Sequence, residues 1–159
     1  MSTGTGTLVL EIIEAKLTRN TELFGKMDPY VVVKVPTRDF QFKTKVHDAG
    51  GKKPKWNESV EIPVKYVGDD MDITVYDLDV LSSDHVGSVS LKFSTFCAAG
   101  GIDDWFTLQY KGKPAGQIHL SGEWTPDYEV KDNAGQQQMG GMMGGMSQMQ
   151  MMQQLQAQQ

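Results

Sequence analysis

The stretch "VYDLDVLSSDHVG", from Val75 to Gly87, places three aspartates, Asp77, Asp79 and Asp84, directly after an alternating apolar run. Two carboxylates about 4 Å apart repel each other by roughly 4 kcal/mol at an effective dielectric constant near 20. Asp77 and Asp79 are two residues apart, so on extended backbone they point to the same side. Because this clustering is costly unless a cation or water relieves the repulsion, the stretch predicts a cation site at the end of a strand.

A second acidic segment, "NTELFGKMDPYVVV" from Asn20 to Val33, carries Glu22 and Asp28 on a glycine-containing loop that leads into a strand. If the two loops meet at one end of the fold, five carboxylates converge. Calcium accepts about six to eight oxygen ligands in irregular geometry, whereas magnesium demands a tighter octahedron. An EF-hand is excluded, because Leu81 and Ser82 stand where that loop needs an acidic or amide residue and glycine. The alternative is that each acidic residue separately caps a turn.

Alternating apolar residues, punctuated by turn residues, predict strands through most of the chain. Eight segments show this pattern: 7–15, 29–35, 40–46, 59–66, 71–77, 86–93, 105–110 and 116–124. In segment 40–46 the expected inward side chains are Phe40, Phe42, Thr44 and Val46, while Gln41, Lys43 and Lys45 face water. Eight short strands without crossover helices predict an all-β fold, an eight-stranded antiparallel β-sandwich.

Length and charge exclude several classes of function. The 159 residues suffice for one domain, and no apolar run approaches the roughly 18 residues needed to cross a bilayer. The N-terminus lacks a basic segment followed by an apolar core, so we expect a cytoplasmic chain without a secretory signal. Cys97 is the only cysteine, which excludes an internal disulfide, and a formal charge of −5 argues against nucleic acid as a partner.

Composition changes after Val130, where the sequence becomes rich in Met, Gln and Gly and holds only two charges. We therefore predict a domain over residues 5–127 and a disordered low-complexity tail over residues 128–159. The alternative for the end of the tail is a short helix over 146–157, since Met146, Met149, Met152 and Leu155 recur at a spacing of three. A protein partner or self-association through this methionine-rich tail is a further hypothesis.

Three motifs, in order along the chain, resemble the C2 domains, a family of calcium- and phospholipid-binding β-sandwiches. They are "FGKMDPYVVVKV", "FKTKVHDAGGKKPKWNESVEI" and "ITVYDLDVLSSDHVGSVSL". The chain opens on a strand at residues 6–17, and "GQIHLSGEW" near the end of the domain resembles the first strand of the family's other circular permutant. The resemblance therefore favours the type II topology.

The resemblance also implies a set of calcium ligands. Asp28, Asp77 and Asp79 match the family's calcium aspartates, and Asp84 matches the last one by its distance of three from Gly87. At the remaining position Glu22 stands where the family usually has aspartate, and the loop from Asp79 to Asp84 is one residue shorter than usual. One or two calcium ions are therefore expected, with main-chain carbonyls near Met27 and Leu78 completing the shell.

Apolar residues beside the acidic positions, Leu23, Phe24, Val80 and Leu81, are predicted to insert into a membrane. Six lysines would add attraction to anionic headgroups: Lys34, Lys43, Lys45, Lys52, Lys53 and Lys55. The alternative for the apolar residues is that they fold back onto the sandwich, and for the lysines that they form a solvated strand face.

The function predicted from these features is calcium-dependent binding to anionic phospholipid membranes by a membrane-recruitment adaptor, which moves from the cytoplasm when calcium rises. The alternative is a calcium-independent scaffold for protein interaction, with the tail recruiting a partner. An enzyme is not expected. The Asp-x-Asp strand end also resembles the haloacid-dehalogenase-type phosphatases, but that fold needs helices between parallel strands. No G-x-S-x-G motif accompanies the three scattered histidines.

Overall fold

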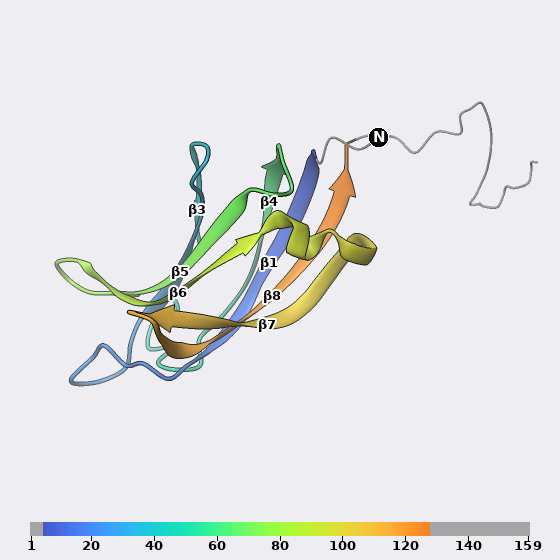
Figure 1. The fold of residues 1–159 in the computed structure, drawn as a ribbon. Coiled ribbons are helices and arrows are strands. Elements are labelled where there is room, and N and C mark those ends of the chain that lie inside the picture. Colours follow the sequence, from blue (N-terminus) through green and yellow to red (C-terminus); the bar gives the residue numbers. More distant parts are fainter. Residues whose placement is uncertain (1–4, 128–159) are drawn as a thin grey trace, which may run out of the picture. The chain divides into compact units, whose positions relative to one another are not determined.

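The computed structural model describes residues 5–127, and eight antiparallel strands account for most of them (Figure 1). The strands are β1 (Gly6–Leu17), β2 (Pro29–Val35), β3 (Phe40–Lys43), β4 (Lys55–Val64), β5 (Asp70–Leu78), β6 (Ser83–Lys92), β7 (Gly101–Tyr110) and β8 (Lys113–Pro126). Two short 3-10 helices, η1 (Phe93–Phe96) and η2 (Ala98–Gly100), join β6 to β7. Within the described residues, neither is long or apolar enough to span a membrane. The predicted all-β fold is confirmed, and the predicted tail lies outside the described residues.

The strands follow the order β3-β2-β5-β6-β7-β8-β1-β4, which divides into two layers of four. The link between the layers is a single register pair, Ser88 with Gln109, so β6 and β7 diverge on either side of it. Leu10 and Ile12 of β1 and Ile73 and Val75 of β5 belong to one buried cluster, although their strands lie in different layers. The two layers therefore close over a shared core, as in a β-sandwich.

The alternation of β5 positions the first acidic residue. Met71, Ile73 and Val75 point into the core at a period of two, and Asp77 takes the next inward position. The strand thus carries a carboxylate into a place where its own pattern expects an apolar side chain.

Several predicted strand boundaries differ from the structure by a few residues, and two of the differences affect the predicted site residues. The strand β6 begins at Ser83, so Asp84 lies on a strand and pairs across the sheet with Asp77 instead of standing on the loop. The strand β3 ends at Lys43, because the Thr44 hydroxyl accepts the amide hydrogen of Val31 (2.9 Å) and ends the ladder with β2. Lys45 therefore lies beyond the strand, where its backbone amide donates to the Glu58 carboxylate (2.7 Å).

Three connections meet at one end of the sandwich, and we name them loop 1 (residues 18–28), loop 2 (residues 44–54) and loop 3 (residues 79–82). Hydrogen bonds join them, from the Leu78 amide to the Asp28 carbonyl (3.0 Å) and from the Gly51 amide to the Met27 carbonyl (3.0 Å). At the opposite end, Gly6 of β1 pairs with the last residues of β4 and β8 (Figure 1). The last strand, β8, pairs along β1, as the type II topology requires.

Candidate metal centre

Asp77 is the buried centre of the acidic residues, with 0% of its surface exposed. Its Oδ2 accepts a hydrogen bond from the Thr21 hydroxyl (2.7 Å), and its Oδ1 accepts one from the Asp28 amide (2.7 Å). A buried carboxylate is destabilising unless it is hydrogen-bonded or paired with a cation. Asp77 therefore holds both ends of loop 1 against the end of β5.

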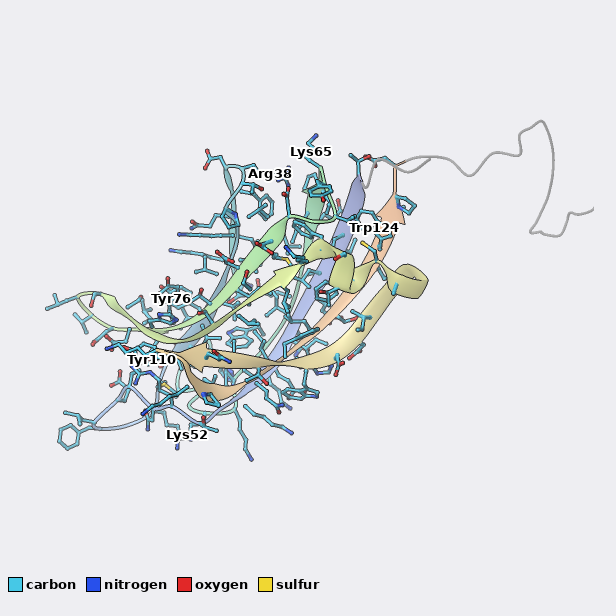
Figure 2. The ribbon with its side chains drawn as sticks, viewed as in Figure 1. Arg38, Lys52, Lys65, Tyr76, Tyr110 and Trp124 are labelled. Carbon is cyan, nitrogen blue, oxygen red and sulfur yellow. The ribbon has the colours of Figure 1, made fainter. Side chains whose placement is uncertain are left out.

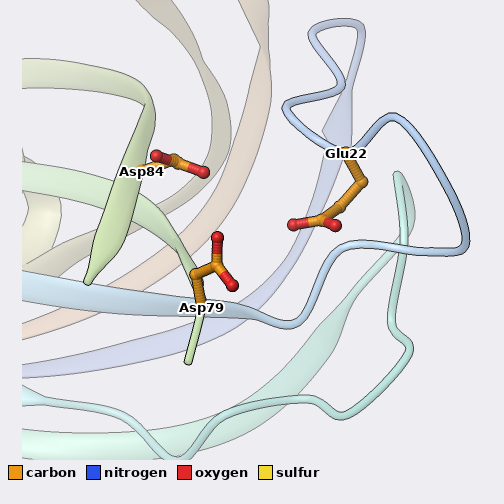
Figure 3. A group of neighbouring side chains, drawn as sticks. All are labelled: Glu22, Asp79 and Asp84. Atoms are coloured by element: carbon orange, nitrogen blue, oxygen red, sulfur yellow. The ribbon is translucent and has the colours of Figure 1, made fainter. Parts of the chain in front are cut away.

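Glu22, Asp79 and Asp84 form the tightest group of carboxylates, with one oxygen from each lying within 4.8 Å of the others. They come from loop 1, loop 3 and β6, and Figure 3 shows the three side chains pointing into one space. Asp84 also stands directly across the strand pair from Asp77. Like charges in that position are destabilising, so the strand pairing itself favours a cation nearby.

The pKa of Glu22 is shifted by this crowding of carboxylates. A hydrogen bond with the Asp77 carboxyl group and the charge of Asp77, followed by burial and the charges of Asp79 and Asp84, raise the pKa of Glu22 from 4.5 to about 7. The sign follows from the environment, because every one of these causes disfavours the ionised form. Near neutral pH the cluster therefore relieves part of its repulsion by holding a proton.

Asp28 lies beside this group and joins the loops. Its Oδ1 accepts a hydrogen bond from the Ala49 amide of loop 2 (2.7 Å), and its backbone carbonyl accepts one from the amide of Leu78, the last residue of β5 (3.0 Å). Asp28 is not part of the three-carboxylate group. Its position follows from the hydrogen bond between its own amide and Asp77.

The two predicted main-chain positions differ in their surroundings. The Met27 carbonyl accepts a hydrogen bond from the Gly51 amide of loop 2, so one of its two lone pairs is already used. The Met27 side chain is fully buried. Leu78 is exposed at the end of β5, between Asp77 and Asp79 in the sequence. Their role as calcium ligands stays a prediction.

The four predicted membrane-inserting residues lie on the tips of loops 1 and 3, where they do not fold back onto the sandwich. Their exposed fractions are 92% for Leu23, 88% for Phe24, 95% for Val80 and 95% for Leu81. Lone exposed apolar residues need no explanation, but here two adjacent pairs lie on the two loops that also carry Glu22 and Asp79.

The six predicted lysines are all exposed but do not form one face. Lys34 of β2 and Lys43 of β3 lie on the outer face of their layer, and the Lys43 ammonium is 5.7 Å from the centre of the Tyr30 ring. Lys52 and Lys53 lie in loop 2, and Lys55 begins β4. Lys45 is exposed as predicted, but it lies beyond the end of β3 and not on the strand predicted over residues 40–46.

Two residues near the site were missed by sequence reasoning. Thr21 donates to Asp77, which lies far along the chain, so no local pattern signals it. The Arg19 guanidinium stacks over Tyr110 (3.7 Å to the ring centre) and donates to the His85 carbonyl (3.4 Å), which fastens loop 1 to β6 and β7. Burial, followed by the charge of Arg19, lowers the pKa of His85.

The donor set can be tested against the cations that proteins bind. The group of three consists of carboxylate oxygens from loop 1, loop 3 and β6, and within residues 5–127 no histidine or cysteine belongs to it. Hard oxygen ligands held by loops suit calcium, while thiolate and imidazole ligands, which zinc favours, are missing from this group. The residues therefore fit calcium.

Fold and donor set agree with the result of a comparison with known families. The family model described as "C2 domain" matches residues 6–108. Because this is more than half of the chain, the protein belongs to the C2 domain family. The resemblance inferred from the motifs is confirmed.

Curated relatives include the extended synaptotagmins. Extended synaptotagmin-1 of Homo sapiens is 34% identical over 97 residues, which cover 60% of this chain and 8% of that protein. Extended synaptotagmin-3 of Xenopus tropicalis is 32% identical over 126 residues, which cover 75% of this chain and 14% of that protein. The chain therefore spans only a small part of the length of these relatives.

Solved structures with the same fold include a calcium-bound one. A calcium-bound pair of C2 domains from extended synaptotagmin 2 aligns with a TM-score of 0.66 and 28% identity, over 79% of this chain and 48% of that chain. A C2 domain of plant extended synaptotagmin 1 aligns with a TM-score of 0.70 and 22% identity, over 78% of this chain and 97% of that chain. Human GIVD cytosolic phospholipase A2 aligns over 18% of its chain at 20% identity with a TM-score of 0.65, covering 79% of this chain. The last two likenesses show the fold alone.

Proposed function

We propose that this chain binds anionic phospholipid membranes in a calcium-dependent manner and acts as an adaptor that is recruited from the cytoplasm when calcium rises. The observation that carries the proposal is the convergence of Glu22, Asp79 and Asp84 within 4.8 Å, next to the two loops that expose the apolar tips. Membership of the C2 domain family and a calcium-bound structure of a similar domain support it.

The carboxylates would hold one or two calcium ions, with Asp28 and Asp77 contributing beside the group of three and the carbonyls of Met27 and Leu78 as further candidates. In the absence of the cation the clustered negative charge repels anionic headgroups and keeps the loops away from the lipid. Bound calcium would supply positive charge there and a coordination position for a lipid phosphate oxygen.

The apolar tips would then supply much of the attachment. Burying a large apolar side chain contributes roughly 1.5–3 kcal/mol, so Leu23, Phe24, Val80 and Leu81 together supply several kcal/mol even if partly inserted. The exposed lysines would each add about 1 kcal/mol near an anionic surface. The absence of enzymatic activity stays a prediction, because the same fold also occurs within a phospholipase A2.

Sedimentation with vesicles that contain phosphatidylserine tests the proposal. The full chain is mixed with vesicles in calcium and in chelator, beside the variant Asp79→Asn with Asp84→Asn. Asp77 and Asp28 are kept because their side chains fasten loop 1 to β5 and to loop 2, whereas within residues 5–127 the side chains of Asp79 and Asp84 make no such connection. We expect calcium to pellet the unmodified chain and to leave the variant in solution.

A matched control removes two carboxylates away from the loops, Asp39→Asn with Asp69→Asn, which lie in the turns before β3 and β5. The control should pellet like the unmodified chain. If Asp79→Asn with Asp84→Asn pellets with calcium as much as the unmodified chain does, the assignment of these two residues as ligands is wrong. Pelleting that survives chelator would favour lysine attachment, and no pelleting in either condition would favour the scaffold alternative.

A further inference from the structure

A pocket lies between loops 1 and 2, beside the acidic cluster but separate from it. Its volume is about 380 Å³, and its lining includes Asn20, Lys26, Met27, Gly51, Lys52 and Lys53. Pockets that bind small ligands typically measure about 300–1,000 Å³, so this one has room for a single polar headgroup.

Backbone hydrogen bonds fix the walls of the pocket. The Gly51 amide donates to the Met27 carbonyl (3.0 Å), and the Leu17 amide at the end of β1 donates to the Lys52 carbonyl (2.7 Å). Gly51 has a φ of +61°, and a Cβ there would lie 3.6 Å from Lys26 Cδ, so the Lys26 stem packs along this glycine. Met27 is fully buried beneath. The pocket is therefore part of the fold.

The lysines of the pocket have no acidic partner. Among residues 5–127, no carboxylate lies within 4.0 Å of the ammonium groups of Lys26, Lys52 and Lys53. The Asn20 side-chain oxygen accepts a hydrogen bond from the Glu22 amide (3.0 Å), which leaves the Asn20 amide nitrogen as a further donor. The pocket is thus lined by three lysines that have no acidic partner among residues 5–127, together with an uncharged donor.

The number of charges selects the chemical class of the ligand. A carboxylate or a phosphodiester carries one negative charge, whereas a phosphomonoester carries about 1.5 to 2 at pH 7 and offers three acceptor oxygens. Lysine binds phosphate as a compact point charge. Three lysines around one small pocket therefore match a phosphomonoester better than a singly charged group.

We propose that the pocket between loops 1 and 2 binds a phosphomonoester, through Lys26, Lys52 and Lys53, without calcium. This inference deepens the proposed function. It rests on that function only in assuming that the phosphate belongs to a membrane lipid. It assigns Lys52 and Lys53 to a pocket with Lys26, apart from Lys34 and Lys43 on the outer face of β2 and β3.

Amide chemical shifts of the full, unmodified chain in chelator provide the first test. Inositol trisphosphate and inorganic phosphate are the soluble probes. We expect saturable shifts at residues 25–27 and 50–53. Shifts centred on residues 32–43, or no saturable shift with either probe, would overturn the proposal.

Vesicles provide the second test and distinguish a lipid source of the phosphate from a soluble one. In chelator, binding to vesicles with phosphatidylinositol bisphosphate is compared with binding to phosphatidylserine vesicles of matched charge. The variant Lys26→Gln, Lys52→Gln, Lys53→Gln should bind the phosphomonoester vesicles at least about tenfold more weakly, given about 1 kcal/mol for each lysine. Soluble binding without vesicle binding would support the pocket and reject the lipid as its carrier.

The matched control removes the same charge elsewhere, as Arg38→Gln, Lys65→Gln, Lys92→Gln. Figure 2 shows Arg38 and Lys65 at the end of the domain away from Lys52. If both variants lose the same amount of vesicle binding, the loss comes from net charge, and the proposed phosphate site in the pocket is wrong. Absent shifts with intact calcium-dependent pelleting would count against the pocket alone, while shifts without such pelleting would count against the calcium switch alone.

Discussion

Asp77 shows how a single residue departs from its local pattern to build a site. It stands where the alternation of β5 places core residues, and it is as buried as Val75 before it. Its two oxygens are satisfied by loop 1, through the Thr21 hydroxyl and the Asp28 amide. The inward carboxylate is therefore tolerated because loop 1 folds over it, and loop 1 is ordered in turn by the carboxylate.

Thr21→Val tests this mutual support. The substitution keeps the shape of the side chain but leaves a buried carboxylate oxygen without its donor, so we expect the free energy of unfolding to fall by about 1–3 kcal/mol. Urea unfolding of the full chain measures it. Thr18→Val, in the same loop at an exposed position, is the control and should stay within about 0.5 kcal/mol of the unmodified chain. Equal effects of the two substitutions would contradict the role of Thr21.

His119 of β8 connects its own strand to β7 and β1, in the layer that does not contain β5. Its Nε2 lies 2.6 Å from Asp103 of β7 and its Nδ1 lies 3.4 Å from Glu14 of β1. The ring also stacks on Trp105 (4.9 Å), over which the Lys16 ammonium lies at 4.7 Å. The hydrogen bond to Asp103, opposed by burial and assisted by Glu14, raises the pKa of His119.

The sign of this shift predicts a pH dependence. A histidine whose pKa is raised by folding contributes stability that is fully present below its unfolded pKa, about 6.5, and that is lost as the pH rises through the folded value. The difference in Tm between the unmodified chain and His119→Gln should therefore be largest at mildly acidic pH and shrink as the solution becomes alkaline. Glu22 titrates in both proteins, so its effect cancels. A difference that grows with pH would contradict the assignment.

At the scale of elements, η1 packs closely against the layer formed by β8 and β1. A Cβ on Gly122 would lie 2.6 Å from Phe96 Cδ1 and 3.1 Å from Leu8 Cδ1. Phe96 and Leu8 are fully buried, so neither can move without disturbing the core.

Gly122→Ala should therefore destabilise the domain through overpacking, by about 1–3 kcal/mol. Chemical denaturation of the full chain, compared with Ser121→Ala on the neighbouring half-exposed position, measures the effect. The control should change the free energy of unfolding by less than about 0.5 kcal/mol. A neutral Gly122→Ala would mean that η1 is not held against β8 as described.

Loops 1 and 3 act as elements through their apolar tips. Phe24→Ser with Leu81→Ser should weaken calcium-dependent binding to phosphatidylserine vesicles, because each inserted side chain contributes up to roughly 1.5–3 kcal/mol, about tenfold to a hundredfold in affinity. Tyr66→Ser is the control, since Tyr66 is also exposed (59%) but precedes β5 at the other end of the sandwich. Unchanged binding by the loop variant would show that the tips stay outside the lipid.

For the whole molecule, a cation held between loops that are far apart in the sequence should stabilise the fold by mass action. A ligand at about a hundred times its Kd adds roughly 2.7 kcal/mol to the free energy of unfolding. We expect the Tm of the unmodified chain to rise with calcium concentration and the Tm of Asp79→Asn with Asp84→Asn to stay constant. Magnesium should act weakly, because its octahedral geometry suits these loops poorly. Equal shifts in both proteins would contradict binding at this cluster.

Much of the fold could be predicted because β-strands repeat every two residues. The segment 29–35 matches β2 at both ends, and the other strands were placed within a few residues. Errors arose where a side chain takes part in the pairing, as at Thr44, whose hydroxyl ends β3 early. The acidic positions were likewise visible, since like charges that cluster in sequence have no structural benefit of their own.

The order of residues along the chain was sufficient to predict an antiparallel sandwich, two acidic loops and apolar residues beside them, because these features depend on neighbours within a few positions. Folding alone decided that Asp84 faces Asp77 across a strand pair, that Thr21 and Ala49 support the carboxylates, and that Lys26 joins Lys52 and Lys53 around a pocket. Each of these contacts depends on how the strands pair. The contacts between residues far apart in the sequence form only when that pairing has brought the loops to one end of the sandwich.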